Sequence, residues 1–202
     1  MKAVVQRVID ATVTVDSALK GGIAAGLLVY LGVARDDTTQ DADWLIEKIP
    51  NLRIFDDENG KMNLSLLDYI VNQQKGMVNN ALVNQEINEV NAIRPHTEHT
   101  ENTKDTENSN CILLRGLRAP RASVRVSGVL AVSQFTLLGD ARKGRRPTWD
   151  KAAPPEQARE LYGYYIEKMG EKVPCQSGEF QAHMRVAYVN DGPVTILLDS
   201  RE

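Results

Sequence analysis

The 202-residue sequence predicts one α/β domain of the α+β type, with a sheet that is closed or layered and helices packed against it. Several segments have the Val-, Ile- and Thr-rich composition of strands, and two others repeat apolar residues at helical spacing, irregularly interleaved with the strands. A hydrophobic share of 42% is ample for a packed core. The length suits a single domain, or one domain that carries an insertion.

Two strands are expected near the N-terminus. Residues 3–15 are rich in Val and Thr and partly alternate between apolar and polar side chains, as half-buried strands do. Residues 23–33 form a mostly apolar run, which favours a buried strand. Gly21 and Gly22 lie between the two segments and predict a turn.

A short helix is expected around residues 44–49, whose apolar side chains recur on one face. Thr38 and Asp41 have the spacing of a capping box at its start. Pro50 should end this helix, because the residue before a proline is pushed away from helical geometry.

The remaining elements follow from the same patterns. Further extended segments are expected at residues 52–55, 63–68, 128–138, 186–189 and 194–198. The last two should be joined by a turn at residues 190–193, which are standard turn residues. A second helix should open at residues 154–156 and continue to about Met169.

Between about residues 70 and 126 the composition changes. The stretch 71–110 is loaded with Asn, Gln, Glu and Thr, and Thr recurs every third residue from Thr97 to Thr106. Such a segment has too little apolar surface to offset the entropy of ordering it. We therefore expect one domain over residues 1–202, interrupted by a flexible, low-complexity insertion. The insertion either loops out, as its composition favours, or disturbs the strand that follows it.

Composition also limits the cell compartment and the partners. A formal charge of −3 argues against a protein that coats nucleic acid through bulk positive charge, so an RNA contact needs a local basic patch. No run approaches the roughly 18 apolar residues of a membrane span, and the start alternates like a strand rather than a signal peptide. Cys111 and Cys175 are isolated thiols, which favours a reducing compartment. The expected location is the cytoplasm.

The common catalytic motifs are missing from the sequence. There is no G-x-S-x-G, H-E-x-x-H, Walker or G-x-G-x-x-G pattern. His96 and His99 fall in the insertion, where a solvated polar tract is the simpler interpretation than a weak metal site. His183 is left in the expected fold without a partner in sequence, and a structural or surface role is the simpler one. Neither metal nor cofactor is expected.

A hydrolase with this composition would have to work without a side-chain base. Backbone N–H groups at a strand end can stabilise a developing oxyanion, which suffices for an activated ester or for a substrate that supplies its own hydroxyl. An aminoacyl ester on a ribose meets both conditions. Two polar strings stand out, at residues 133–137 and 190–195. Their plain interpretations are a strand that switches faces and an ordinary turn.

Together these strings resemble the D-aminoacyl-tRNA deacylase (D-Tyr-tRNA deacylase) family. The matching strings stand in the family's order and are MKAVVQRV, GLLVYLGVARDDT, NLRIFDDENGKMNLSLLD, VSQFTLLGDARKGRRP, AAPPE and VNDGPVT. They cover nearly everything except about residues 69–127. Several long ungapped strings are a far more specific signal than one short motif.

The resemblance implies a homodimer of α/β subunits built round a β-barrel-like sheet with flanking helices. Ser133, Gln134, Phe135 and Thr136 would line the pocket for the 3′-terminal adenosine and its aminoacyl group. The chemical argument favours backbone N–H groups near Phe135 and Thr136 as the oxyanion hole, with the adenosine 2′-hydroxyl assisting. Thr136 as a covalent nucleophile is the second route.

The resemblance further implies that Gly192-Pro193 is the family's Gly-cisPro dipeptide, which enters the active site of the partner subunit. Backbone carbonyls against the α-carbon would exclude L side chains, while D side chains point to open space. Glycine has no side chain to exclude, so glycyl-tRNA, including glycine mischarged on tRNA-Ala, should also be cleaved.

Five basic residues complete the expected site. Arg7 would hold the Gly-Pro loop, with an exposed strand arginine as the alternative. The other four are candidates for tRNA phosphates, with a merely solubilising loop as the alternative: Arg142, Lys143, Arg145 and Arg146.

The expected function is chiral proofreading in translation, by hydrolysis of the ester of D-aminoacyl-tRNA to free amino acid and tRNA. The expected partners are the aminoacylated 3′ end of tRNA and a second subunit; neither DNA nor a membrane is expected. Three alternatives remain. They are a nucleic-acid-binding module on the same fold, a relative that also edits some L-aminoacyl-tRNAs, and a purely structural dimer, which would leave both polar strings unexplained.

Overall fold

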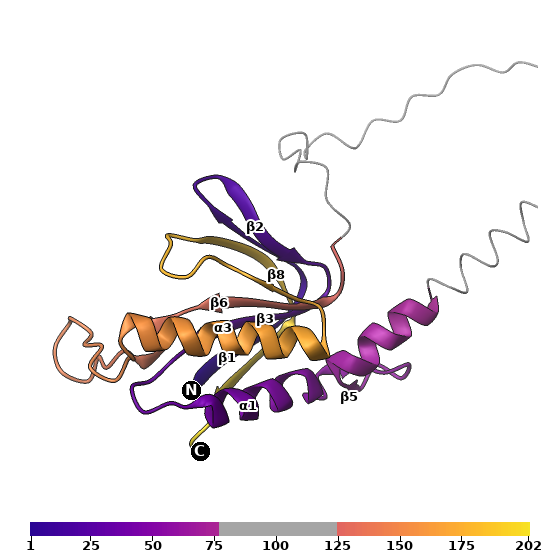
Figure 1. Cartoon of the computed structure of the whole chain (residues 1–202). Coiled ribbons are helices and arrows are strands. Elements are labelled where there is room, and N and C mark those ends of the chain that lie inside the picture. The colour runs from indigo at the N-terminus through magenta and orange to yellow at the C-terminus, as the bar shows by residue number, and fades with distance from the viewer. Residues whose placement is uncertain (77–124) are drawn as a thin grey trace, which may run out of the picture. The chain divides into compact units, whose positions relative to one another are not determined.

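The computed structural model describes residues 1–76 and 125–202 (Figure 1). Most of the predicted insertion at about 70–126, with His96, His99 and Cys111, lies outside these residues, so its boundaries and its looping out stay predictions. Met1–Asn72 and Arg125–Glu202 form one compact unit, which holds the sheet and the helices described next.

The unit is built on a six-stranded sheet. Its strands are β1 (Lys2–Val15), β2 (Ala18–Ile23), β3 (Gly26–Gly32), β6 (Gly128–Ser133), β7 (Cys175–Ser177) and β8 (Arg185–Asp199). The order is β2-β1-β3-β6-β7, and β8 pairs with β1. The β3–β6 and β6–β7 pairs are parallel and the others antiparallel. A separate small hairpin joins β4 (Phe55–Asp56) to β5 (Met62–Leu64).

The long strand β1 pairs along both of its edges. Its first half pairs with β3 and its second half with β2, while β8 runs antiparallel to it from Lys2 to Thr14. At the open side, β2 comes close to β7: a Cβ on Gly21 would lie 2.8 Å from the backbone oxygen of Ser177. The sheet is thus nearly closed, which confirms the expected barrel-like sheet with flanking helices.

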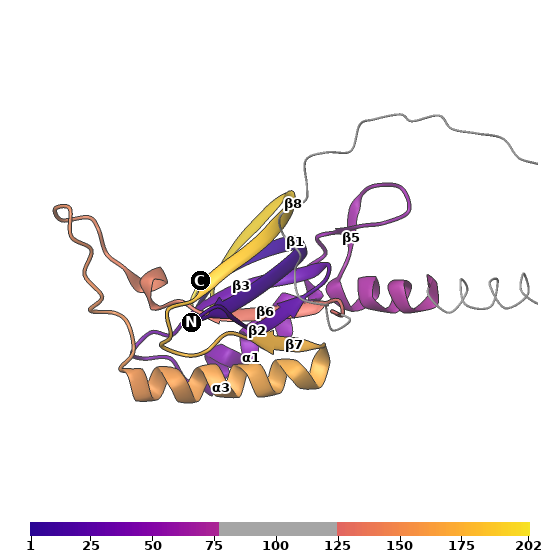
Figure 2. The same cartoon turned by 90° about the horizontal axis from the view of Figure 1, so that it is seen from above.

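Two helices lie side by side against one face of the sheet, α1 (Thr39–Lys48) and α3 (Pro155–Lys172) (Figures 1 and 2). Leu45 of α1 and Tyr165 of α3 pack in one buried cluster with Leu27 and Val29 of β3. Leu28 belongs to a second buried cluster, on the opposite face of the strand. Because β3 is buried on both faces, its sequence is continuously apolar rather than alternating.

The expected helix at residues 44–49 is confirmed, with its capping box and its end. The Asp41 carboxylate accepts a hydrogen bond from the Thr38 backbone N–H at 2.8 Å. α1 ends at Lys48, and Pro50 lies in the short 3₁₀ helix η1 (Ile49–Asn51) that follows. The second expected helix is also confirmed, as α3. No helix in the described residues is long and apolar enough to cross a membrane.

Two predicted boundaries in the first half are wrong. The turn after β1 is at Asp16 and Ser17, both with positive φ, whereas Gly21 and Gly22 lie inside β2. Gly21 is needed because the Ser177 backbone oxygen comes too close for a side chain, not because the chain turns there. The extended segment expected at 63–68 stops at Leu64, and a helix begins at Leu66 behind the capping pair Ser65–Asp68.

Three other extended segments also differ from expectation. The strand expected at 52–55 is reduced to β4, Phe55–Asp56. The segment expected at 128–138 is strand only to Ser133, because the 3₁₀ helix η2 (Phe135–Leu138) follows. The two strands expected at 186–189 and 194–198 are one strand, β8, and residues 190–193 are not a hairpin turn, since both halves pair with β1.

We expect Gly21→Ala to lower the free energy of unfolding by about 1–3 kcal/mol, because the new methyl group meets the fixed backbone of Ser177. Urea titration followed by circular dichroism measures the change. The matched control is Gly163→Ala in α3, where a Cβ meets nothing within 4 Å. This change should be stabilising, by about 0.5–1 kcal/mol. Equal effects at both positions would contradict the near closure of the sheet.

Candidate active site

The first polar string lies where the central strand β6 ends. β6 runs parallel to β3 as far as Ser133, which pairs with Leu31. The Gln134 N–H then donates to the Leu31 backbone oxygen at 2.8 Å, and the chain turns into η2. Gly32 permits this turn, because a Cβ there would lie 2.5 Å from Leu138.

The turn leaves backbone donors at the start of η2. In the described part of the chain, the N–H groups of Phe135 and Thr136 donate to no other residue. The Thr136 hydroxyl accepts a hydrogen bond from the Gln134 side-chain amide. Phe135 and Thr136 are both exposed. The local arrangement can therefore offer two neighbouring N–H groups to an oxygen of a bound molecule.

A cavity of about 700 Å³ opens beside this turn. Ser133, Gln134 and Phe135 line it, whereas Thr136 is not among its lining residues. Small apolar residues at and before the start of α3 form another side, among them Ala152, Ala153, Pro155 and Ala158. Three of the four residues expected to form a pocket are thus brought together, in a mostly apolar setting.

The segment 180–186 also lines the cavity, and of its side chains before residue 186 only His183 was considered from the sequence, for which a structural or surface role was the simpler interpretation. Phe180, Gln181 and His183 all line the cavity. Gln181 has a φ of +64°, a left-handed conformation that is uncommon for a residue other than glycine. The Arg159 side chain holds this segment, since its guanidinium lies 3.0 Å from the Gln181 side-chain oxygen and 4.8 Å from the Phe180 ring centroid.

Tyr162 anchors the floor of the cavity. Its hydroxyl donates to the Ala131 backbone oxygen at 2.9 Å. Burial raises the pKa of this phenol well above its usual range, so it stays neutral and acts as a fixed hydrogen-bond donor. His183 is exposed and makes no side-chain hydrogen bond to another described residue. Among the described residues, no group of three or more His, Cys, Asp or Glu could hold a metal ion.

The second polar string forms a bulge in β8. Gln6 pairs with Thr195 and Val8 pairs with Asn190, so the four residues 191–194 lie opposite the single residue Arg7. The Gly192–Pro193 peptide bond is cis, as the resemblance implied, and both residues are exposed. Neither lines the cavity beside η2. Within one chain, the predicted site residues therefore form two separate groups.

Arg7 contacts this bulge from within the core. Its side chain is only 7% exposed, which excludes the alternative of an exposed strand arginine. Nη1 donates to the Ile54 backbone oxygen at 2.5 Å, and Nε lies 3.0 Å from an Asp191 carboxylate oxygen. A Cβ on Gly192 would lie 3.1 Å from Arg7 Nη2. The guanidinium thus joins the β4 segment to the bulge.

The basic loop after η2 is a short hairpin. Asp140 and Thr148 exchange two backbone hydrogen bonds of 2.9 Å at its base. The Arg142 guanidinium hydrogen-bonds the Asp140 carboxylate and holds the pKa of that carboxyl far below its usual range. The other three cations are exposed and have no ion-pair partner within the described ranges: Lys143, Arg145 and Arg146.

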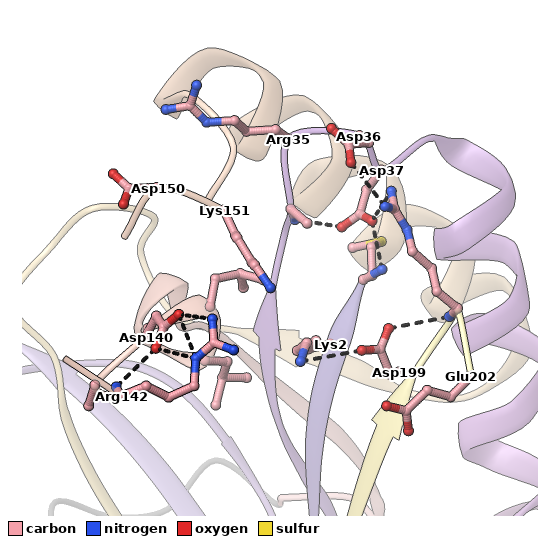
Figure 3. A pocket seen from close by; sticks show the side chains of 17 residues that line it. Lys2, Arg35, Asp36, Asp37, Asp140, Arg142, Asp150, Lys151, Asp199 and Glu202 are labelled. Atoms are coloured by element: carbon pink, nitrogen blue, oxygen red, sulfur yellow. Dashed lines mark hydrogen bonds and ion pairs between the residues drawn. The ribbon is translucent and has the colours of Figure 1, made fainter. Parts of the chain in front are cut away.

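A larger cavity, of about 850 Å³, is lined by Leu137 and Leu138 of η2 and by residues near both chain termini (Figure 3). Its charged groups largely neutralise one another, because Lys2 pairs with Asp199 at 3.3 Å and Arg142 pairs with Asp140. Of the predicted site residues only Arg142 lines it. The smaller cavity is therefore the candidate active site.

Comparison with known proteins decides the family. The model of the family described as D-Tyr-tRNA(Tyr) deacylase matches residues 4–85 and 121–199. The chain belongs to this family. The match includes both polar strings and leaves residues 86–120 unmatched. The family assigned from the sequence strings is confirmed, and with it the expectation that the chain is a hydrolytic enzyme.

Individual relatives agree with the D-Tyr-tRNA deacylase family. The D-aminoacyl-tRNA deacylase of Kosmotoga olearia is 44% identical over 202 residues, covering 100% of this chain and 99% of the relative. That of Koribacter versatilis is 43% identical over 204 residues, with the same coverage. Both are similar to this chain over essentially their whole length.

Two solved structures share the fold. The "c-Myc DNA Unwinding Element Binding Protein" superposes with a TM-score of 0.67 at 30% identity, covering 98% of each chain. A probable eukaryotic D-amino acid tRNA deacylase superposes with a TM-score of 0.60, covering 98% of this chain and 97% of that one. Its 13% identity supports the fold alone.

We expect Arg7→Met to lower the free energy of unfolding by about 1–3 kcal/mol, because the buried Ile54 oxygen loses its donor. Chemical denaturation measures this loss. Lys2→Met on the same strand removes an exposed partner of Asp199 and should change stability by at most about 0.5 kcal/mol. If the two variants were equally stable, Arg7 would not be holding the bulge.

Proposed function

We propose that this protein hydrolyses the ester bond of D-aminoacyl-tRNA, releasing the D-amino acid and free tRNA. Family membership and relatives named D-aminoacyl-tRNA deacylase support the reaction class. The observation that carries the proposal is a pair of neighbouring N–H groups, at Phe135 and Thr136, that donate to no other described residue and lie at the end of β6 beside an apolar cavity.

In the proposed mechanism the protein supplies geometry rather than a strong base. The terminal adenosine and its aminoacyl group occupy the cavity lined by Ser133, Gln134 and Phe135. The ester carbonyl oxygen faces the Phe135 and Thr136 N–H groups, which stabilise the negative charge that develops when water attacks. The adenosine 2′-hydroxyl assists this attack. His183 lines the cavity, but no described carboxylate orients its ring, which disfavours a histidine-based relay.

Selection against L-amino acids requires a second subunit in this proposal. Gly192 and Pro193 are exposed and braced by Arg7, yet they lie outside their own chain's cavity. A loop that is held rigidly and exposed in this way suits insertion into the cavity of a partner. Backbone atoms placed against the substrate α-carbon would leave no space for an L side chain and would admit a hydrogen or a D side chain. The substrates then include glycyl-tRNA.

We expect the purified protein to release D-tyrosine from D-Tyr-tRNA and glycine from Gly-tRNA, while L-Tyr-tRNA persists. Acid-precipitable radiolabel followed over time measures all three reactions. If D-Tyr-tRNA were cleaved and Gly-tRNA stayed intact at the same enzyme concentration, the result would contradict selection by exclusion of L side chains. L-Tyr-tRNA that is cleaved as fast as D-Tyr-tRNA would instead favour an editor with relaxed chirality.

Thr136→Val tests the backbone mechanism, because it removes the hydroxyl and keeps the N–H group. The kcat on D-Tyr-tRNA should change by less than about three-fold, whereas removing an oxyanion donor typically costs about 10²–10³-fold. Single-turnover hydrolysis is the measurement. A loss in kcat of about 10²–10³-fold would favour Thr136 as the nucleophile.

Gly192→Ala should lower the ratio of D- to L-Tyr-tRNA hydrolysis about ten-fold or more. Gly192 has a φ of +112°, and an added Cβ would meet Val194 at 2.7 Å, so the bulge must move. Gly60→Ala is the matched control, since φ there is +70° and a Cβ meets nothing within 4 Å. Competitive hydrolysis of the two esters measures the ratio. Equal ratios in both variants, or a monomeric active enzyme, would remove the bulge from the mechanism.

A second candidate function is a nucleic-acid-binding module without catalysis. The observation that favours it is the likeness to a protein named for binding a DNA unwinding element. Release of free D-amino acid by the wild-type chain separates the two, because a binding module would leave the ester intact.

A further inference from the structure

Two aromatic side chains are exposed together at the rim of the candidate cavity. Phe135 is 56% exposed and Trp149 is 39% exposed. Their rings meet edge to face, with centroids 5.3 Å apart and an interplanar angle of 75°. Phe135 lines the cavity and Trp149 does not, so the pair extends an aromatic surface outward from the cavity. An exposed aromatic pair beside a site points to a ligand with flat apolar faces.

Trp149 is held in place by the backbone around it. A Cβ on Gly139 would lie 2.5 Å from the indole atom Cζ3, so the ring occupies the space that a side chain would otherwise fill. The Trp149 backbone oxygen accepts from the Ala152 N–H at 2.9 Å. The Asp140–Thr148 pairing closes the hairpin immediately before Trp149. A ring that is already fixed loses little entropy when a ligand stacks on it.

The hairpin that leads to Trp149 carries several exposed cations. Figures 1 and 2 show the segment between β6 and α3 extending away from the sheet. Arg142 is bound to Asp140 and braces the hairpin, whereas Lys143, Arg145 and Arg146 are exposed without an acidic partner in the described residues. Aromatic rings for bases beside cations for the backbone are the combination that binds single-stranded nucleic acid.

We propose that Trp149 stacks on an unpaired nucleotide of the tRNA 3′ end, next to the terminal adenosine, while Lys143, Arg145 and Arg146 contact its phosphates. This rests on the proposed function, in which the terminal adenosine fills the cavity that Phe135 borders. The strand that leads to this adenosine then passes over the aromatic rim. A base in a duplex has no free face, so the surface selects the single-stranded end.

The first test compares a complete and a minimal substrate, D-Tyr-tRNA and the 3′-D-tyrosyl ester of adenosine. Trp149→Ala should raise KM for D-Tyr-tRNA about ten-fold, because the tRNA carries the base that stacks on Trp149. The kcat and KM for the adenosine ester should stay unchanged, because this substrate lacks that base. Trp149→Phe should restore most of the affinity. Trp44→Ala is the matched control, because Trp44 is the other tryptophan of the chain, similarly exposed on α1.

Three outcomes would overturn the proposal. The first is an unchanged KM for D-Tyr-tRNA in the Trp149→Ala variant, and the second is a rise in KM that is equal for both substrates. The third is a lower sedimentation coefficient of the Trp149→Ala variant, which would mean that a second copy of the chain covers Phe135 and Trp149.

A second test does not need catalysis. In a Trp44→Phe protein, Trp149 is the only tryptophan, and a single-stranded RNA oligonucleotide ending in CCA should quench its fluorescence. A blunt RNA duplex should not. If the wild-type protein cleaves neither ester but the quenching occurs, the deacylase proposal fails and the RNA surface stands. Absence of quenching at micromolar RNA overturns the surface.

Discussion

The pairing register of β1 determines where both polar strings lie. Its first half fixes β3, and β3 in turn aligns β6 so that Ser133 is opposite Leu31 and the chain turns into η2. The other edge of β1 pairs with both halves of β8, and residues 191–194 between these halves bulge out opposite the single residue Arg7. A one-residue slip along β1 would move buried side chains to the wrong face and displace both strings. The cavity and the bulge are thus two consequences of one ladder.

The bulge depends on a buried charge that the same ladder places. Arg7 projects from β1 where β8 has excess chain, and its guanidinium contacts the Ile54 backbone and the Asp191 carboxylate. A guanidinium can make several such contacts at once because its N–H donors are fixed in a plane. The exposed Gly192-Pro193 dipeptide therefore lies on a bulge that contacts the core of the same chain through Arg7.

Local pattern was sufficient for some elements and not for others. α1 follows from its capping box and Pro50, and β1 from its Val-rich alternation. The turn predicted at 190–193 is wrong because the same residue types favour a bulge and a turn, and only the pairing of both flanks with β1 distinguishes the two. Of the four residues expected to line a substrate pocket, Ser133 to Phe135 line a cavity and Thr136 does not, and their role in binding stays a prediction. Gln181 was missed because a positive φ leaves no signal in a residue type that rarely adopts it. The burial of Arg7 is likewise a tertiary property.

The parallel pairing of β3 with β6 has a consequence for biosynthesis. Leu27 to Leu31 are apolar on both faces, and β6, which covers one edge of this strand, is synthesised only after the long segment that includes residues 77–124. In the nascent chain the edge of β3 that later pairs with β6 is therefore unpaired while the ribosome synthesises that segment. Such edges associate with other chains. A partner that shields this edge during translation would matter more for the yield of this enzyme than for its final stability.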